Sequence, residues 1–416
     1  MGGHYHCDGC LYNWAVRILL LNLYYPPDAS ATAKMARIVA EALATKHEVT
    51  ILCGRPSYDP TERRSWKLGR IETSGRLRII RVGSTDFPRF QMKRRVLNYL
   101  TYVALSVPLA VFLRCDVVLA MTDPPFEGIV GAFVALLKRK PYVYNIRDLY
   151  PDMAVAGSVI EPGVLTRLWG TLHHWALRHV TRVIVLGDDM RARIISKGVA
   201  PERVVVVRDG AEIPMAGAPG RTIDGEVTRA IREGFRFVLL HAGNLGFYGA
   251  WETLLTAAGQ LSGDGIGLVF VGDGAQRAQL QVLAGSLRNV RFLPFFPASK
   301  VQSVLAAADA HVVTIKRGLE GIVVPSKMYG ILAAGKPIVS VASQGTDVAS
   351  LCQQIGCGVC CDPDRPEELV RAVRELASDP VRLKTMSEAA KAAAPKYDKN
   401  VEAHKFIQIL EEAAKA

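Results

Sequence analysis

The sequence predicts an α/β protein with two doubly wound domains that face each other across a central cleft. The length of 416 residues is typical of about two domains, and half of the residues are hydrophobic. In each half of the chain, short apolar runs alternate with amphipathic segments, which is the pattern of a parallel sheet with helices on both faces. The segment 209–235 is rich in Gly, Pro and small residues, so the domains are expected to join there.

The first half opens with a buried strand at 16–25 and a helix at 30–47 that Ser30 or Thr32 can cap. The further elements expected in this half are strands 48–54 and 77–83, helix 96–113, strand 115–122, helix 126–140, strand 141–148, helix 165–180, strand 182–187, helix 188–198 and strand 202–210.

The second half repeats the alternation. Its expected elements are strand 235–243, helix 250–261, strand 266–274, helix 275–287, strand 290–296, helix 299–308, strand 310–316, strand 358–363 and surface helices 366–379 and 380–394. Between 319 and 339 we expect a loop, a short helix that starts near Pro325 and Ser326 and ends at Gly335, and a strand. Ligands of such sheets bind beyond the carboxyl ends of the strands, so the loops after 243, 274 and 316 should line one wall.

We divide the chain into five parts on this pattern. They are a leader at 1–16 that we expect to be disordered, a first domain at 17–212, a linker at 213–234, a second domain at 235–395, and a C-terminal helix at 396–416 that can pack back on the first domain.

Histidines and cysteines gather in two places, and neither place has the spacing of a zinc site. The leader holds His4, His6, Cys7 and Cys10, and the segment 352–361 holds four cysteines. We therefore predict no bound metal. Cysteines without paired spacing fit a reducing cytoplasm, and the first apolar run is not followed by a signal-peptide cleavage site.

The net charge of +12 calls for an anionic partner or surface. Arg89, Lys93, Arg94 and Arg95 form a basic cluster, but no zinc finger or aromatic-interleaved basic repeat accompanies them, so we expect no nucleic acid. The uncharged run 96–113 has about the minimum length of a membrane span. Polar residues dilute it, so we favour a buried or interfacial helix. The basic cluster before it would meet an anionic membrane face, which predicts a cytoplasmic protein peripheral to the inner side of the membrane.

Five motifs of the second half occur in one order with ordinary spacing: HAGNLGFYG, LVFVGDGAQRAQLQ, NVRFLPFFPASKV, AADAHVVTIK and VVPSKMYGILAAGKPIV. This series resembles the donor domain of glycosyltransferase family 4, which has the GT-B architecture of two Rossmann-like domains. In the first half, YYPPDASATAKM and YNIRDLYPDM resemble elements of the same family. The resemblance covers about 17–410 and is greatest to the branch that builds bacterial surface polysaccharides and lipid-linked glycans.

The resemblance implies a retaining enzyme that needs no bound metal or other cofactor. The donor would be a nucleotide-sugar, most simply a UDP-sugar, and the acceptor a glycan carried on a polyprenyl or other lipid. Two other classes stay open. A nucleotide-sugar epimerase of the same architecture would convert the donor without an acceptor, and a non-catalytic member of a glycan assembly complex would bind nucleotide weakly.

The diphosphate of such a donor gains negative charge as the glycosidic bond breaks, so it needs N–H donors and cations. Gly321, Ile322 and Val323, in the loop before the short helix, can supply N–H groups. Lys316 and Arg317 directly follow a strand on the cleft side, and Lys316 is the preferred phosphate ligand.

Other candidates lie in the glycine turns and the short helix. Gly243, Asn244 and Gly246, together with Gly272 of the second turn, would let the backbone approach the donor, although plain tight turns have the same composition. Lys327 lies in the first helical turn and could bind phosphate or face solvent.

The chain departs from the family pattern at three places. The basic residue that usually follows the glycine turn is absent from 247–251, which shifts its role to Lys316 and Arg317. The family's acid pair falls on Ile322 and Gly330, and neither residue is acidic.

Three other acids are therefore candidates. Glu320 could contact the sugar or be a plain loop charge, and Asp347 could hold the ribose or cap a helix. The family's His-Asp element falls on Arg147 and Asp148. Asp148 is the remaining anchor near the reacting centre, unless it forms a salt bridge with Arg147 or acts as a cap. The predicted catalytic residues are Asp148, Lys316 and Glu320.

Overall fold

The computed structural model describes residues 15–28, 30–56, 69–87, 92–157, 160–213 and 223–416. The histidines and cysteines of the leader, Arg89 of the basic cluster and most of the linker lie outside these residues. The described chain forms two compact units, one from the residues up to 143 together with 406–416, and the other from 144–405. The prediction of an α/β fold with two parallel sheets is confirmed.

The first sheet has eight strands in the order β3-β4-β2-β1-β5-β6-β7-β8. Its strands are β1 (Arg17–Leu21), β2 (Glu48–Cys53), β3 (Arg70–Ser74), β4 (Leu77–Arg81), β5 (Val117–Ala120), β6 (Tyr142–Asn145), β7 (Arg182–Val185) and β8 (Val204–Val206). β1 lies parallel to both β2 and β5, whereas β3 runs antiparallel to β4 at the edge. The sequence pattern missed β3 because most of its residues are exposed and it has no apolar run to mark it.

Helices follow these strands in the predicted alternation. They are α1 (Ala31–Ala44), α2 (Met92–Phe112), α3 (Glu127–Lys138), α4 (Asp152–Ala156), α5 (Val164–Arg178), α6 (Asp188–Ser196) and the 3-10 helix η2 (Pro201–Arg203). The cap of α1 is Ser30, whose hydroxyl accepts a hydrogen bond from the Ala33 N–H at 3.0 Å. Thr32, the alternative cap, lies inside the helix.

The second sheet has six parallel strands in the order β11-β10-β9-β12-β13-β14. They are β9 (Phe237–Ala242), β10 (Ile266–Val271), β11 (Val290–Leu293), β12 (Ala310–Thr314), β13 (Ile338–Val341) and β14 (Gly358–Cys361). β9, β10 and β12 are almost wholly buried because helices cover both faces, which explains their continuous apolar runs.

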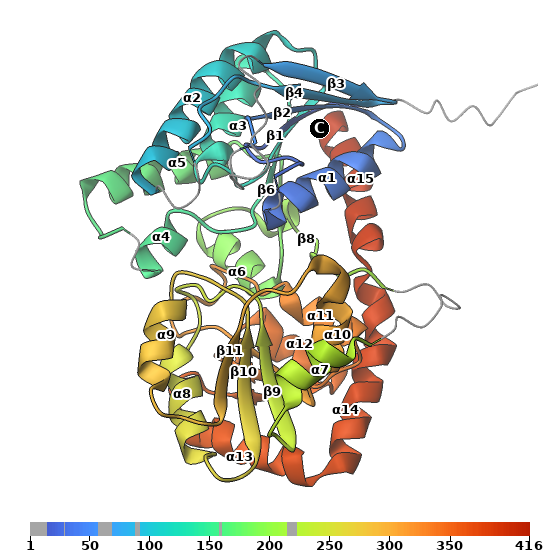
Figure 1. Ribbon diagram of the computed structural model, residues 1–416. Helices are drawn as coiled ribbons and strands as arrows, with labels where there is room; N and C mark the ends of the chain where they lie inside the picture. The colour runs from blue at the N-terminus through green and yellow to red at the C-terminus, as the bar shows by residue number, and fades with distance from the viewer. Residues whose placement is uncertain (1–14, 29, 57–68, 88–91, 158–159, 214–222) are drawn as a thin grey trace, which may run out of the picture. The chain divides into compact units, whose positions relative to one another are not determined.

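Helices connect these strands, cover both faces of the sheet and continue to the C-terminus. They are α7 (Gly225–Arg232), α8 (Trp251–Gln260), α9 (Arg277–Ala284), η3 (Ala298–Lys300), α10 (Val301–Ala306), α11 (Lys327–Ala333), α12 (Asp347–Ile355), α13 (Pro366–Ser378), α14 (Pro380–Ala393), η4 (Ala394–Tyr397) and α15 (Lys399–Lys415). α8, α9 and α13 share one hydrophobic core with the sheet, and α7 and α10 share another on the opposite face (Figure 1).

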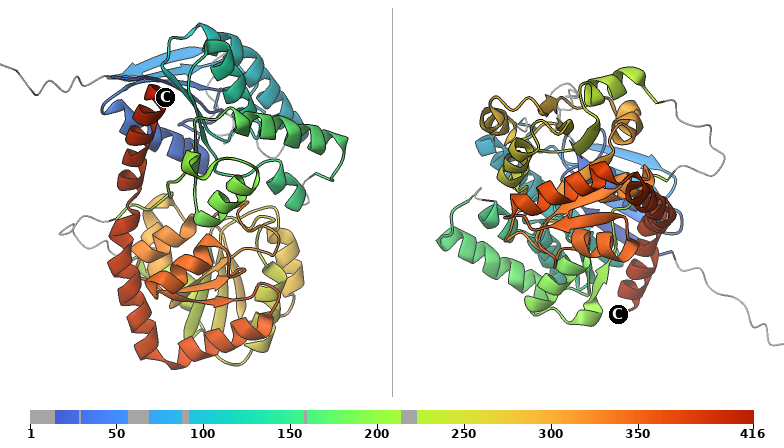
Figure 2. Two further views of the ribbon diagram at one scale, coloured as in Figure 1. Left: turned by 180° about the vertical axis from the view of Figure 1, so that it is seen from behind. Right: turned by 90° about the horizontal axis from the view of Figure 1, so that it is seen from below.

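The end of α15 belongs to the first unit (Figure 2). There Glu411 lies 3.3 Å from Nε2 of the buried His47, in the turn between α1 and β2. This contact attaches the last residues of the chain to the same unit as its first strand.

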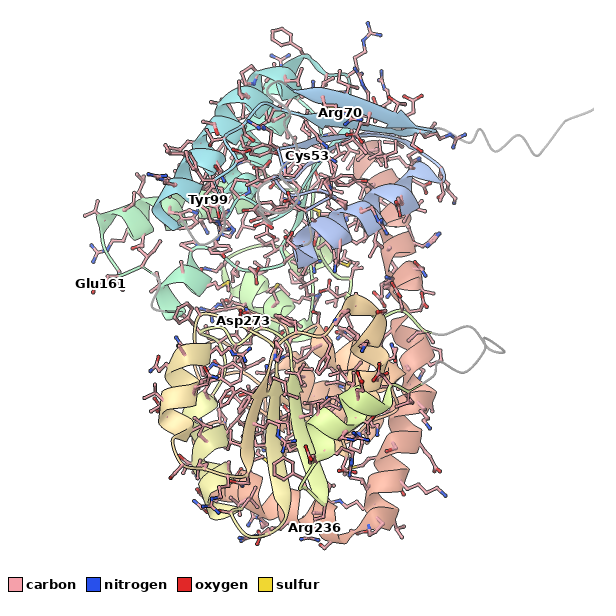
Figure 3. The ribbon with its side chains drawn as sticks, in the orientation of Figure 1. Cys53, Arg70, Tyr99, Glu161, Arg236 and Asp273 are labelled. Atoms are coloured by element: carbon pink, nitrogen blue, oxygen red, sulfur yellow. The ribbon has the colours of Figure 1, made fainter. Side chains whose placement is uncertain are left out.

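Figure 3 labels one residue at each of the two ends of the strands of the second sheet. Asp273 follows β10 at the carboxyl edge, and Arg236 precedes β9 at the opposite edge. Because all six strands are parallel, the loops that follow β9, β10 and β12 meet at the edge marked by Asp273.

Candidate functional site

Hydrogen bonds join the three loops at this edge into one wall. The Leu245 N–H, after β9, donates to the Asp273 carbonyl, after β10, at 2.9 Å. The Lys316 N–H, after β12, donates to the Tyr248 carbonyl at 2.7 Å. The prediction that these loops lie together is therefore confirmed by their direct contacts.

Glycines make the close approach of two of these loops possible. Gly272 has a φ of +151°, and a Cβ at this position would collide with the carbonyl oxygen of Gly243. A Cβ at Gly274 would collide with the carbonyl of Leu245. Gly243 itself has a φ of +141°, which is unfavourable for any side chain. These turns are thus more than generic tight turns, because each glycine allows one loop to touch the other.

Lys327, the first residue of α11, extends toward this junction. Its Nζ would lie only 3.6 Å from a Cβ on Gly243, so the amine occupies the space beside that glycine. The imidazole of His241, at the end of β9, lies 3.1 Å from the same Nζ, and the ring of Tyr248 lies 5.9 Å away. Burial lowers the pKa of Lys327 to about 7. The lysine that could have faced solvent is therefore turned into the wall.

The loop before α11 does not offer its amides as predicted. The Gly321 N–H donates to the Asp189 carboxylate at 3.3 Å, and the Ile322 N–H donates to the Leu319 carbonyl at 3.1 Å. Val323 forms an isolated antiparallel bridge with Asp148. The amides of Gly321 and Ile322 therefore already have partners within the protein.

Arg317 is also engaged elsewhere, contrary to the expectation that it neutralises a phosphate. Its guanidinium forms a two-oxygen contact with Asp362 at 2.7 and 2.8 Å and a second ion pair with Asp364. Lys316, its neighbour, lines a cavity of about 490 Å³ next to Trp251 and the glycine turn. The two adjacent cations therefore have different surroundings: Lys316 lines the cavity, and Arg317 pairs with two carboxylates at the surface.

Asp347 belongs to an ion pair and not to a helix cap. Its Oδ1 accepts hydrogen bonds from the Arg208 guanidinium at 2.8 Å and from the Asp188 N–H at 3.0 Å. The N-cap of α12 is Thr346. Burial raises the pKa of Asp347, and the charge of Arg208 opposes that shift. Both bonds use Oδ1, and the buried Oδ2 has no hydrogen-bond partner among the described residues.

The other predicted acids have different surroundings. Both carboxylate oxygens of Glu320 accept hydrogen bonds, from the Gly318 N–H at 2.8 Å and from the Ser343 hydroxyl at 2.6 Å. Arg147 pairs with Asp209 at 2.7 Å. Burial raises the pKa of Tyr248, and the charge of the nearby, half-buried Asp148 raises it further.

The structure thus brings Gly243, Gly272, Lys327 and the backbone of Lys316 to one wall, with Asn244 and Gly246 in the same turn. Within the described part of the chain, no group of three or more His, Cys, Asp or Glu side chains is arranged to hold a metal ion.

Comparison with known proteins agrees with this architecture. Residues 31–210 match the glycosyl transferase 4-like domain, and residues 230–393 match the glycosyl transferases of group 1. The chain belongs to glycosyltransferase family 4. It is a transferase enzyme of the GT-B fold, as the sequence motifs predicted.

Two curated relatives are named as glycosyltransferases, and the name of one of them refers to colanic acid biosynthesis. The putative colanic acid biosynthesis glycosyl transferase WcaI of Escherichia coli is 26% identical over 379 residues, which cover 86% of this chain and 92% of WcaI. The probable glycosyltransferase WbjE of Pseudomonas aeruginosa is 27% identical over 304 residues, which cover 70% and 74% of the two chains.

Solved structures show the shared fold. Anabaena HepE in complex with UDP-glucose superposes with a TM-score of 0.67 at 18% identity, covering 96% of this glycosyltransferase and all of HepE. WaaG, a glycosyltransferase of lipopolysaccharide biosynthesis, superposes with a TM-score of 0.63 at 18% identity, covering 94% and 99%.

Sequence reasoning missed two residues of this glycosyltransferase's wall. His241 was not among the predicted site residues, although its buried ring contacts Lys327. Asp189 holds two loops, because its Oδ2 accepts from both the Gly321 and the Asp347 N–H. His241 had a usable signal, a polar side chain that ends an apolar strand before a glycine turn. Asp189 had none, because its partners lie more than 130 residues away in the sequence.

The space at Gly330 gives a first prediction. A Cβ there would meet only Leu305 Cδ1, at 3.8 Å, so a longer side chain fits. Because the family places a ribose-binding acid at this position, Gly330→Glu is expected to tighten UDP binding several-fold, measured by calorimetry. Gly330→Ala should leave affinity unchanged while stabilising the helix by about 0.5–1 kcal/mol. Equal or weaker UDP binding by the Glu variant would contradict the ribose assignment.

Proposed function

We propose that the protein is a retaining glycosyltransferase that moves a sugar from a UDP-sugar to a lipid-linked glycan at the inner face of the cell membrane. The observation that carries the donor assignment is the Lys327 amine at Gly243, where the loops after β9 and β10 meet. The complexes of HepE with UDP and UDP-glucose support a nucleotide-sugar as donor.

In this proposal Lys327 stabilises the leaving group. As the bond between the anomeric carbon and the β-phosphate oxygen breaks, the UDP oxygens gain negative charge. A cation held at Gly243 can donate a charge-assisted hydrogen bond to those oxygens. The family's basic residue after the glycine turn is absent here, and Tyr248 lies in that segment with Lys327 5.9 Å from its ring. Lys327 would therefore supply from α11 the charge that this turn lacks.

The acceptor side of the proposal rests on Asp148. Its backbone is bridged to Val323, and its charge acts on Tyr248, so it lies next to the donor wall. A carboxylate here can anchor an acceptor hydroxyl near the reacting carbon. Lys316 and the cavity beside it would hold further parts of the donor or acceptor. No metal ion or cofactor enters the proposed reaction.

The test of the donor site compares two lysines. Lys327→Met is expected to weaken UDP binding about 10- to 100-fold in calorimetry, since a hydrogen bond to a charged group contributes about 1.5–3 kcal/mol. UDP release that depends on added acceptor should fall in parallel. Lys384→Met removes an exposed lysine of α14 and serves as the control. Unchanged affinity in Lys327→Met would overturn the assignment, and donor conversion without any acceptor would indicate the epimerase.

Helix α2 buries polar side chains and exposes apolar ones, which supports the membrane part of the proposal. α2 buries Asn98, Tyr102 and Ser106, whereas Leu100 is 55% and Phe112 is 85% exposed. Within the described residues, Arg94–Phe112 is the one helix long and apolar enough to cross a membrane by length and composition, and 22% of it is buried. An apolar face turned outward fits a helix that lies in a membrane interface.

α3 adds to the exposed apolar side chains of α2, because it packs against α2 and exposes Phe133, Leu136 and Leu137. We call the exposed apolar side chains of α2 and α3 the apolar face. Basic residues border it where the two helices end. Arg114, Lys138 and Lys140 line a basin of about 500 Å³ next to Phe112. Cations beside an apolar face match the phosphates and acyl chains of an anionic lipid surface.

Vesicle flotation tests this surface. The protein is expected to bind vesicles that contain phosphatidylglycerol and to bind pure phosphatidylcholine vesicles at least tenfold more weakly, because each basic residue near an anionic surface contributes about 1 kcal/mol. Leu100→Glu combined with Leu137→Glu should abolish binding, since both charges would enter the apolar face. Val282→Glu, at an exposed apolar position of α9, is the matched control. Equal binding of all three proteins would contradict the proposal.

A further inference from the structure

The contact between the buried His241 and the half-buried Lys327 joins two basic groups. His241 is 0% exposed, and its Nε2 and Nδ1 lie 3.1 and 3.4 Å from Lys327 Nζ. Burial and the charge of Lys327 lower the pKa of His241 well below its usual range, so the imidazole is neutral. A neutral imidazole has one nitrogen that accepts a hydrogen bond, and the lysine amine can donate to it.

Aromatic side chains also contact the imidazole of His241. Its ring packs edge-on against Trp251, with the ring centroids 4.9 Å apart, and Trp251 Nε1 donates to the Gly246 carbonyl at 2.7 Å. The ring of Phe270 lies 6.0 Å away on the neighbouring strand. These contacts hold the imidazole in one orientation and connect it to the glycine turn.

No acid balances the lysine. In the described chain, Lys327 forms no ion pair, and burial alone accounts for its lowered pKa. The titratable groups that face it are His241 from β9, His311 from β12 and Tyr248 from the turn before α8. Burial lowers the pKa of His311 to about 4 and raises that of Tyr248, so all three are neutral near pH 7. The amine is therefore placed for an anion that the protein itself does not provide.

We propose that His241 is a positioning residue that holds the Lys327 amine beside Gly243, and that this pair takes up one proton when the diphosphate of the donor binds. The inference rests on the proposed function, because it takes the anion to be the diphosphate. The proton goes to Lys327, and the resulting ammonium donates both to the imidazole and to a phosphate oxygen.

The direction of the pH effect follows from the charge. With a pKa of about 7, Lys327 is mostly charged at pH 6 and mostly neutral at pH 8 in the free protein. A bound diphosphate favours the charged form and raises that pKa. Binding at pH 8 should take up about 0.9 of a proton, and affinity should fall up to about tenfold per pH unit above 7. Affinity below pH 7 should be insensitive to this group.

Calorimetry with UDP at pH 8.0, in buffers of different ionisation enthalpy, measures the uptake directly. UDP is fully ionised at this pH, because its second phosphate pKa is about 6. Lys327→Arg keeps a permanent charge and should bind UDP with uptake near zero and no loss of affinity between pH 7 and 9. Lys336→Arg is the matched control, since burial also lowers the pKa of Lys336 but its amine bonds to the Ala308 carbonyl. It should keep the full uptake.

The role of His241 is tested with two substitutions. His241→Phe keeps a ring against Trp251 but removes the acceptor, and should weaken UDP binding about tenfold. His241→Gln retains an acceptor oxygen and should recover part of that loss. Equal affinities of the two variants would overturn the positioning role.

The outcomes separate this inference from the proposed function. Binding of UDP to the unaltered protein without proton uptake, or uptake that persists in Lys327→Arg, would overturn the inference and leave the donor assignment intact. Absence of UDP binding to the unaltered protein would contradict the proposed donor and the inference with it.

Discussion

The site depends on the contact between two backbone turns at the carboxyl edge of the second sheet. Gly272 and Gly274 let the turn after β10 press against the turn after β9, at places where a Cβ would strike a carbonyl oxygen. This contact fixes Gly243 and, through it, the space that Lys327 enters. The turn after β12 joins the same arrangement through the Lys316–Tyr248 hydrogen bond. Three strands of one sheet therefore place their loops with little freedom, which is what a site that discriminates a transition state requires.

Much of the fold could be predicted from the sequence because alternating apolar strands and amphipathic helices have few compact solutions. The edge strand β3 was missed because most of its residues are exposed. Side-chain direction was harder to predict than element type. Lys316, Arg317 and Lys327 are all basic residues near the same loop, and only tertiary contacts distinguish them. Arg317 turns to Asp362 and Asp364, and Lys327 turns to His241, partners between 45 and 86 residues away in the sequence.

The surroundings of the acids were hard to predict for the same reason, because they too depend on tertiary contacts. Glu320 and Asp347 stood close to the loop in sequence, which made them candidates, but each is engaged by partners that spacing does not reveal. Among the described residues, the wall of this glycosyltransferase is consequently poor in available carboxylates, and Lys327 forms no ion pair. A half-buried cation without a carboxylate partner is costly in a resting protein. Lowering its pKa reduces that cost until an anion arrives, so the unusual lysine and the missing acids have one physical explanation.

The measurement that tests this account most directly is a crystal structure of the protein with UDP bound. The account predicts that a diphosphate oxygen lies within hydrogen-bond distance of Lys327 Nζ, beside Gly243, while His241 keeps its contact with the amine. A diphosphate bound at the Lys316 cavity, with Lys327 still turned only to His241, would contradict it.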